Sequence, residues 1–599
     1  MNRKNTKWIG AAVALTCGLP IQAVAADTEA VGTPTVKHVL LLSIDGMHAV
    51  DFRNCRLGVA GANGGEPFCP NLAALGQSAL VYTAAATSKP SDSFPGLMSI
   101  VTGGTPKTMG VYYDVAYDRS LDAPAQTTGN GVAAGPCTPY GTPTGTTTEY
   151  EEGIDLDQTK LNGGIPGAGL TDGGVRAIDA KRLPRDPAWG CKPVYPWDFV
   201  RTNTIFGVVH AAGGYTAWAD KHPAYASVSG RGGGNLDDFF SPEINSNVVA
   251  LPGVRTSLGD SCSAVRDLSQ TGSWTDSFAN IQCYDAIKVN AILNQIAGKT
   301  HNGAQAKVPA LYGMNFQAVS VGEKLIEANV GRGGYLNAAG APGAELLGEI
   351  KYVDAAIGDM VNALKDSGQF NDTVIIVTAK HGQSPIDPNL YQAKPGKTGN
   401  GTTPATLLAN LLPESESPLN PTGIGATEDD LSMLWLKNGA SVTSAVATLE
   451  ENAAAIGLGQ IFYGPTLALN YNEPGLAPGQ DPRTPDIIIT PNVGVTYTGS
   501  AKKLEEHGGF SHDDTNVVLI VAHAGTHAGE ISIPTTTAQV APTILKVLGL
   551  SPSALESVRL EGTQVLTGID ATQQQYPPTS PMRTAPHPGS GSHLTSHPF

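Results

Sequence analysis

The sequence predicts an α/β protein with a mostly parallel central sheet and helices on both of its faces. Short continuous apolar runs recur along the chain, which is typical of strands buried on both faces. Segments with apolar residues at helical spacing alternate with these runs, as a parallel sheet requires. Residues that can do chemistry stand at the ends of several runs, and the carboxyl ends of strands are where open α/β sheets bind ligands.

The apolar runs give the expected strands, and the amphipathic segments give the expected helices. The expected strands are His38–Ile44, Ala79–Tyr82, Ile205–Val209, Tyr215–Trp218, Leu311–Gln317, Thr373–Thr378, Asp486–Thr490 and Val517–Val521. The expected helices are Phe94–Val101, Ala286–Ile296, Glu345–Leu364, Ser441–Ile456 and Thr536–Leu548. Pro95 suits the first turn of its helix, because a missing N–H costs nothing there.

Composition limits the class of protein. The chain has 599 residues, of which 41% are apolar, enough for one large domain with insertions or for two to three domains. The 71 glycines and 43 prolines, with only 15% charged residues, indicate long ordered loops. The net charge of −16 argues against a nucleic-acid partner, because binding phosphate backbones needs basic patches.

The first residues have the pattern of a secretory signal. Met1–Ala25 begins with basic residues, continues as the apolar run Trp8–Leu19 and ends at the small residues Ala23-Val24-Ala25. The run is too short to span a bilayer, so we expect cleavage rather than the alternative, a retained anchor. The mature protein is then expected to be periplasmic or secreted, without membrane contact.

The remaining chain is expected to form one α/β domain over residues 26–572, followed by a disordered tail over 573–599 that is rich in Pro, Ser, His and Gly. Residues 105–200 have no clear period and form a loop-rich insertion over the active face. Its aromatic residues are expected to pack locally rather than to line a substrate pocket. They are Tyr112, Tyr113, Tyr117, Tyr140 and Tyr150.

Six cysteines remain once the signal is removed. An even number in an exported chain indicates disulfides. Pairing of sequence neighbours gives Cys55–Cys69, Cys137–Cys191 and Cys262–Cys283. Fifteen connectivities are open to six cysteines, so the sequence leaves the others open. No CxxC pair indicates a cysteine zinc site.

Thr87–Gly104, TSKPSDSFPGLMSIVTGG, places Ser91 and Ser93 at the start of the helix that contains Pro95. Unpaired backbone N–H groups at a helix N-terminus favour anions, above all phosphate. A serine at this point is either an N-cap, for which it is a preferred residue, or a nucleophile that faces an anion. This segment alone favours the cap.

Polar residues at other strand ends change that balance. Asp45 follows the run HVLLLSI, His381 follows TVIIVTAK, and His507 precedes the strand expected at Val517–Val521. A carboxylate, imidazoles and a hydroxyl at one sheet edge suit a metal ion with an activated nucleophile. Each residue alone has a structural alternative; Asp45, for example, can cap the next turn. Their shared position at strand ends is the stronger signal.

Four stretches in this order resemble a known family. They are HVLLLSID, PSDSFPGLMSIVTGG, TVIIVTAKHGQ and EHGGF–DDTN. They look like the type I phosphodiesterase/nucleotide pyrophosphatase branch of the alkaline phosphatase superfamily. The likeness spans about residues 36–105 and 305–550 and omits the central insertion.

The resemblance implies an alkaline-phosphatase-like fold and a site for one or two divalent ions, usually zinc, that hydrolyses small-molecule phosphate esters. It implies that Ser93 is the nucleophile, forming a phosphoseryl intermediate. It implies metal ligands at Asp45, Ser93, His381 and His507. A neighbouring Asn contacts phosphate oxygens in the family; Asn315 is the candidate here.

The sequence departs from the family at two places. The family's Asp-His-Gly reads Lys380-His381-Gly382, and its Asp-x-x-x-His is expected at Asn315-Phe-Gln-Ala-Val319. Anionic and imidazole ligands are thus lost while a cation is gained, so two ions at about 4 Å would lack anionic compensation. A normal two-zinc site is therefore not expected.

Three outcomes stay open. In one, Lys380 acts as a catalytic cation in place of one metal, and a single ion is held by Asp45, Ser93, His381 or His507. In another, His512, Asp513 or Asp514 completes the metal sites, although capping of their own loop is the favoured interpretation. In the last, the protein is a catalytically impaired binding module. Sulfatases of the superfamily use one metal with lysines, but SDSFP lacks their Cys/Ser-x-Pro-x-Arg signature.

Every enzymatic interpretation makes one geometric demand. Residue 93 must lie within a side chain's reach, on the order of 10 Å, of residues 45 and 381.

Overall fold

The computed structural model describes residues 36–150, 175–246, 248, 250–266, 273–394, 401–498, 503–523 and 528–569. The predicted signal at 1–25 and the predicted tail at 573–599 lie outside the described residues. None of the described helices is long and apolar enough to cross a membrane.

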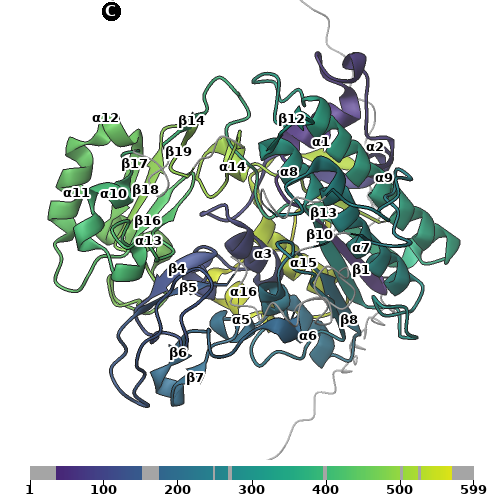
Figure 1. Ribbon diagram of the computed structural model, residues 1–599. Coiled ribbons are helices and arrows are strands. Elements are labelled where there is room, and N and C mark those ends of the chain that lie inside the picture. The colour runs from purple at the N-terminus through teal and green to yellow at the C-terminus, as the bar shows by residue number, and fades with distance from the viewer. Residues whose placement is uncertain are drawn as a thin grey trace, which may run out of the picture. The chain divides into compact units, whose positions relative to one another are not determined.

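An eight-stranded sheet lies at the centre of the fold (Figure 1), in the order β21-β2-β20-β13-β1-β10-β8-β9. The strands are β1 His38–Ile44, β2 Ala79–Tyr82, β8 Thr216–Ala219, β9 Asp238–Phe240, β10 Leu311–Phe316, β13 Thr373–Thr378, β20 Ile520–Ala522 and β21 Gly529–Ile531. All neighbouring pairs are parallel except those of β20, which is antiparallel to both β13 and β2. The prediction of a mostly parallel sheet is confirmed.

Helices cover both faces of this sheet, as predicted. The helices are α1 Ala49–Leu57, α2 Pro70–Gln77, α3 Ser93–Thr102, α4 Pro106–Met109, α5 Pro196–Phe199, α6 Ile205–Ala211, α7 Phe278–Ile296, α8 Ala318–Lys324, α9 Ala344–Asp366, α15 Val540–Val547 and α16 Glu556–Glu561. In β1, Leu40 and Leu42 point into the core with α2, α7 and α9, whereas Val39 and Leu41 point into the core with α3, α6 and α15. Alternate residues of the strand therefore pack into two separate hydrophobic layers, one on each face of the sheet.

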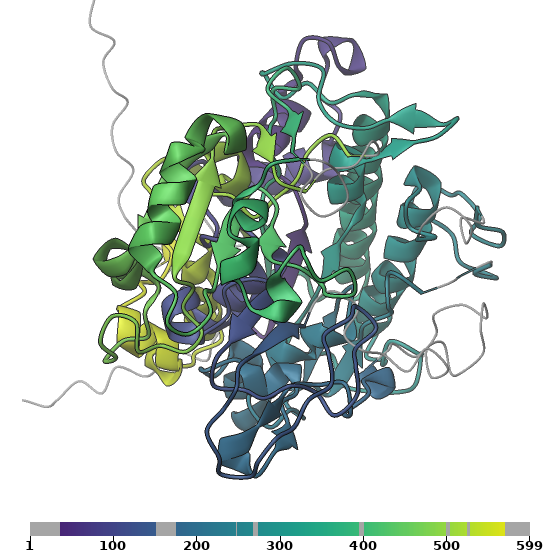
Figure 2. The same ribbon diagram turned by 60° about the vertical axis from the view of Figure 1, so that its left-hand side comes forward.

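The later half of the chain forms a second, four-stranded sheet beside the first (green in Figure 2). Its strand order is β15-β16-β18-β17. Its strands are β15 Thr427–Glu428, β16 Ser432–Leu434, β17 Leu458–Tyr463 and β18 Ile487–Pro491, and the nearby helices are α10 Pro404–Leu407, α11 Val442–Glu451, α12 Ala453–Ile456, α13 Gly464–Tyr471 and α14 His512–Thr515. The predicted strand Asp486–Thr490 is thus correct as a strand, here β18, but it belongs to this smaller sheet. The predicted helix Ser441–Ile456 is divided into α11 and α12 at Asn452.

The described part of residues 105–200 consists mainly of loops with short hairpins. They are β4 Val115–Asp118 with β5 Thr146–Glu149 and β6 Arg185–Asp186 with β7 Lys192–Pro193. Other short pairs are β3 Ala85–Ala86 with β22 Thr535–Thr536, β11 Ile326–Glu327 with β12 Gly331–Arg332, and β14 Gln392–Ala393 with β19 Val495–Thr496. Tyr112, Tyr113 and Tyr150 are buried, whereas Tyr140 is exposed.

The three predicted disulfides are all present: Cys55–Cys69, Cys137–Cys191 and Cys262–Cys283. One strand prediction is wrong. Ile205–Val209 belongs to helix α6, because Thr204 caps it by accepting a hydrogen bond from the Gly207 N–H. Ile205, Phe206 and Val209 then share the buried face of the helix, and this packing outweighs the preference of β-branched residues for strands.

Candidate active site

The candidate site lies at the carboxyl edge of the central sheet. The strands β8, β10, β1 and β13 are parallel neighbours, so their carboxyl ends share that edge. Asp45 directly follows β1, Lys380 lies two residues beyond β13, and Asp220 and Lys221 directly follow β8. The local sequence therefore places several charged side chains around one point.

Ser93 is the first residue of α3 and is fully buried. Its Oγ lies 2.9 Å from His381 Nε2, 3.0 Å from Lys221 Nζ and 3.4 Å from Asp45 Oδ2. The N-cap is Asp92, whose side chain accepts a hydrogen bond from the Phe94 N–H. The cap interpretation of Ser93 is therefore wrong, and its hydroxyl is directed at the sheet edge. The demanded proximity of residues 45, 93 and 381 is met.

Asp45 is fully buried among donors. Its Oδ2 accepts hydrogen bonds from Asn315 Nδ2 at 3.1 Å and from Gln317 Nε2, and it lies 3.6 Å from Lys221 Nζ and 4.0 Å from Lys380 Nζ. Burial alone would raise the pKa of Asp45, but the charges of Lys380 and Lys221 outweigh burial and hold the pKa below its usual range. Asp45 is therefore ionised at neutral pH.

Lys380 is ion-paired with Asp220 and lies 4.0 Å from Asp45 Oδ2, and its role in catalysis stays a prediction. Its Nζ lies 2.9 Å from Asp220 Oδ1 and 3.7 Å from the ring centroid of Tyr225. Trp218 Nε1 donates to the other oxygen of Asp220 at 3.0 Å. Both members of the pair are fully buried. The ammonium is thus held rigidly in a low-dielectric position.

The two histidines stack on each other, with ring centroids 4.1 Å apart. His381 Nδ1 lies 3.0 Å from the Gly382 carbonyl oxygen, which fixes the ring with Nε2 toward Ser93. His507 Nδ1 lies 3.7 Å from Asp92 Oδ1. Burial lowers the pKa of His381 to about 4, against the opposing charge of Asp45, and burial also lowers the pKa of His507. Both rings are therefore neutral at pH 7.

The structure thus brings together all six predicted site residues, with His507 reaching Ser93 only through the ring of His381. Sequence reasoning missed Lys221, Asp220 and Gln317. The signal for the first two was present, because Ala-Asp-Lys-His directly follows the strand expected at Tyr215–Trp218. The side chains of Lys221 and His507 are the most exposed of the site, with exposed fractions of 12% and 14%. The site is therefore open to solvent at these two residues.

Of His512, Asp513 and Asp514, the last caps its own loop, because Ser511 and Asp514 form a capping box at the start of α14. The Asp513 carboxylate instead accepts a hydrogen bond from the Ile386 N–H at 3.0 Å, in the loop that follows Lys380 and His381. Val319, the position aligned with a family histidine, is buried in the core and offers no ligand atom.

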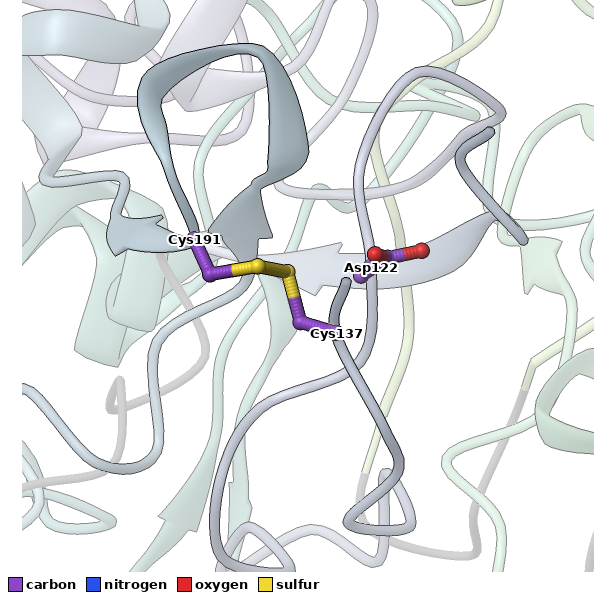
Figure 3. Close-up of side chains that lie close together, drawn as sticks. All are labelled: Asp122, Cys137 and Cys191. Carbon is purple, nitrogen blue, oxygen red and sulfur yellow. A yellow bond between two sulfur atoms is a disulfide. The ribbon is translucent and has the colours of Figure 1, made fainter. Parts of the chain in front are cut away.

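Two clusters of three His, Cys, Asp or Glu ligand atoms within 4.8 Å of one another occur among the described residues. One is Asp122 with Cys137 and Cys191 (Figure 3), but these sulfurs form a disulfide and are not thiolates. The other is His48, Asp51 and Glu323. Neither cluster contains a residue that contacts Ser93.

The His48 cluster is a buried polar network as well as a candidate cation site. His48 Nδ1 lies 2.9 Å from Asp51 Oδ2 and 3.4 Å from Glu323 Oε1, and the Tyr335 hydroxyl contacts both carboxylates. Burial raises the pKa of Glu323 to about 7, against the effect of His48. Gln383 donates to Glu323 Oε2 at 2.7 Å and from its N–H to His48 Nε2 at 3.0 Å. The network therefore anchors the loop that carries Lys380 and His381.

Helix α3 approaches that loop closely at Gly96. A Cβ on Gly96 would lie 2.2 Å from the carbonyl oxygen of Lys380, which is backbone and cannot turn aside. We expect Gly96→Ala to lower the free energy of unfolding by about 1–3 kcal/mol through overpacking and to lower activity by moving Ser93. Urea denaturation and an ester hydrolysis assay measure both effects.

Gly348→Ala is the matched control. Gly348 lies in helix α9 with no atom within 4 Å of an added Cβ. Alanine there should raise the free energy of unfolding by up to about 1 kcal/mol, because glycine is a poor helix former. Equal behaviour of the two variants would contradict the close approach of α3 to the Lys380 loop.

The sequence model of the family "Type I phosphodiesterase / nucleotide pyrophosphatase" matches residues 39–144 and 335–514. Over these residues the chain matches this branch of the alkaline phosphatase superfamily. It is a phosphoric ester hydrolase of a family that depends on divalent metal ions. Asp45, Ser93, His381 and His507 lie inside the matched ranges, whereas Asp220, Lys221 and Asn315 lie between them.

Solved structures with a similar fold include murine ectonucleotide pyrophosphatase / phosphodiesterase 5, at 12% identity and a TM-score of 0.48 over 86% of this chain and 96% of that chain. Another is phosphonoacetate hydrolase from Sinorhizobium meliloti 1021 in complex with phosphonoacetate, at 14% identity and a TM-score of 0.46 over 86% and 96%. No curated protein matches the sequence significantly. These structural likenesses are too remote to indicate a substrate.

Proposed function

We propose that the protein hydrolyses small-molecule phosphoric esters with Ser93 as the nucleophile, through a phosphoseryl intermediate. The observation that carries this proposal is the position of Ser93 Oγ, within 3.4 Å of a carboxylate, an ammonium and a neutral imidazole. A hydroxyl with an adjacent base and a nearby cation is the arrangement of an activated nucleophile. The family match supplies the reaction type.

The fixed cations suit an anionic substrate. Lys380 is held by Asp220 and lies 4.0 Å from Asp45, so we propose that it stabilises charge on the phosphoryl oxygens as they become more negative. The assignment of Asn315 to substrate binding stays a prediction, because its side-chain amide donates to Asp45. The substrate would enter from the side of Lys221 and His507.

The described residues do not fit the family's pair of zinc ions. Zinc takes thiolate, imidazole and carboxylate ligands, and the clusters of three such ligands among the described residues lie away from Ser93. Amide N–H groups and ammonium groups, which are donors, surround the Asp45 oxygen that faces Ser93. The assignments of Asp45, Ser93, His381 and His507 as metal ligands stay predictions, and metal analysis of the purified protein tests them.

We further propose that the protein is exported, to the periplasm or beyond. The three disulfides support an oxidising compartment, and the signal pattern at Met1–Ala25 supports secretion. The net charge of −16 fits a small-molecule substrate rather than nucleic acid.

A substrate panel tests the proposal. Purified protein is expected to hydrolyse p-nitrophenyl phosphate or bis-p-nitrophenyl phosphate, and acid quenching during turnover should leave phosphate on a peptide that contains Ser93. Hydrolysis of p-nitrophenyl sulfate alone would favour the sulfatase-like alternative. A folded protein that hydrolyses none of the three esters would support the binding-module alternative and contradict the enzymatic proposal.

A further inference from the structure

The side chain of Lys221 lies beside the proposed nucleophile, although no motif of the family model covers it. Its Nζ donates to Ser93 Oγ at 3.0 Å and lies 3.6 Å from Asp45 Oδ2. Lys221 is fixed at the carboxyl end of β8, and its own N–H donates to Asp220 Oδ1 at 2.8 Å. Asp220 also pairs with Lys380, so one carboxylate links the two lysines.

A divalent ion that bridged Ser93 and Asp45 would have to lie about 2 Å from an oxygen of each. The Lys221 ammonium lies next to those same two oxygens. Asn315 and Gln317 also donate to Asp45 Oδ2, and an amide N–H₂ group cannot coordinate a cation through its nitrogen. These donors therefore surround one oxygen of Asp45, Oδ2, where a bridging metal ion would otherwise lie, whereas Asp45 Oδ1 is buried without a hydrogen-bond partner among the described residues.

The positive charge of this site comes from lysines on two strand ends. Lys380 stands where the family motif has a carboxylate ligand, and it is paired with Asp220 rather than with an incoming ion. Lysine keeps a compact positive charge with three donors. Lys221 has its ammonium at Ser93 Oγ, whereas the Lys380 ammonium lies between Asp220 and the ring of Tyr225. Of the two lysines, Lys221 is thus the one placed to act on the nucleophile.

We propose that Lys221 is a catalytic residue that supplies, in place of a divalent ion, the positive charge at Ser93 Oγ, so that ester hydrolysis needs no metal ion at this site. The inference rests on the proposed function, because it concerns the same nucleophile. It predicts an unusual member of a metal-dependent family, one whose activity resists chelation.

The chemical step balances with the residues in place. Ser93 Oγ gives its proton to His381 Nε2 and forms a bond to phosphorus, while the bond to the leaving oxygen breaks on the opposite side of phosphorus and that oxygen takes a proton from solvent. Water then attacks the phosphoserine from that opposite side and gives a proton to solvent. The bond between phosphorus and Oγ breaks, and Oγ takes back the proton from His381. Lys221 keeps its proton and stabilises the negative charge that develops on Oγ.

Chelation of the wild-type protein and substitution of Lys221 test this together. After dialysis against EDTA and 1,10-phenanthroline, the full chain should keep its rate on the phosphate ester it hydrolyses, with substoichiometric metal by mass spectrometry. Lys221→Gln should lower kcat by about 10²–10³-fold, the usual effect of losing one donor to a developing oxyanion, and Lys221→Arg should restore part of it. Lys37→Gln is the control, because Lys37 is exposed and pairs with the remote Asp372.

The outcomes separate the two proposals. Loss of wild-type activity on chelation with recovery on added zinc would overturn the role of Lys221, and so would a Lys221→Gln variant of wild-type rate. Chelator resistance is measured on the wild-type protein, so it decides the question even if Lys221→Gln does not fold. A folded wild-type protein without any ester hydrolysis would defeat the proposed function itself, and this inference with it.

Discussion

Ser93→Ala is expected to lower kcat for phosphoric ester hydrolysis by roughly 10⁴-fold or more, because loss of the nucleophile disables the groups that act with it. The Ser93 hydroxyl contacts His381, Lys221 and Asp45, and none of these side chains can form the phosphoseryl intermediate in its place. The fold should survive, since Asp92 rather than Ser93 caps α3. Steady-state kinetics and acid-quench detection of phosphoenzyme give the two readouts.

Ser99→Ala provides the control on the same helix. Ser99 is also buried, but its hydroxyl donates to the Gly104 carbonyl at 2.8 Å, at the far end of α3. This variant should keep the wild-type kcat within a small factor and lose only about 1 kcal/mol of stability. A Ser93→Ala protein that turns over ester at the rate of Ser99→Ala would rule out the nucleophile assigned here.

Asp220→Asn is expected to destabilise the protein by about 3–5 kcal/mol, because it leaves the buried ammonium of Lys380 without its main counter-charge. Both side chains of the pair are fully buried and their closest atoms lie 2.9 Å apart. The same substitution should lower activity, since Asp220 positions Lys380 directly and Lys221 through its backbone. Urea unfolding at pH 7 measures the first effect and the ester assay the second.

Asp372→Asn tests whether burial of the ion pair is the reason that Asp220→Asn destabilises the protein. Asp372 forms a 2.6 Å ion pair with Lys37, but the two side chains are 35% and 65% exposed. Exposed pairs contribute little to stability, so this variant should unfold at a urea concentration close to that of the wild type. Similar losses in both variants would show that desolvation does not govern the Lys380–Asp220 pair.

Local patterns were sufficient to locate most of the proposed reaction centre. A continuous apolar run followed by a polar residue predicts a strand end, and it led to Asp45 beyond β1 and to Lys380 and His381 beyond β13. Pro95 in a first helical turn led to Ser93. Neighbour pairing also led to all three disulfides. These features are readable because each depends on residues that are close together in the chain.

Other features depend on partners that are distant in the chain. The strand predicted at Ile205–Val209 became helix α6 because its apolar side chains pack under Trp218 and α15, which the sequence does not show. The cap of α3 is Asp92 and not one of the neighbouring serines. Asp92 also accepts a hydrogen bond from the Asp114 N–H, a contact that the local sequence does not show. Lys221 was missed because its proposed role depends on its contact with Ser93, which lies more than a hundred residues earlier in the chain.

By itself, the sequence indicated an α/β sheet, a signal pattern for export, one of fifteen possible sets of disulfide pairs, and a hydroxyl, a carboxylate and two imidazoles near one edge of the sheet, because strand and helix signals are local. Only the tertiary structure decided which charges meet there. Parallel packing of β8 on β10, which itself pairs with β1, brings Lys221 to Ser93 and Asp220 to Lys380. The charge balance of a buried site depends on residues from several strands, so it cannot be read from any single stretch of the sequence.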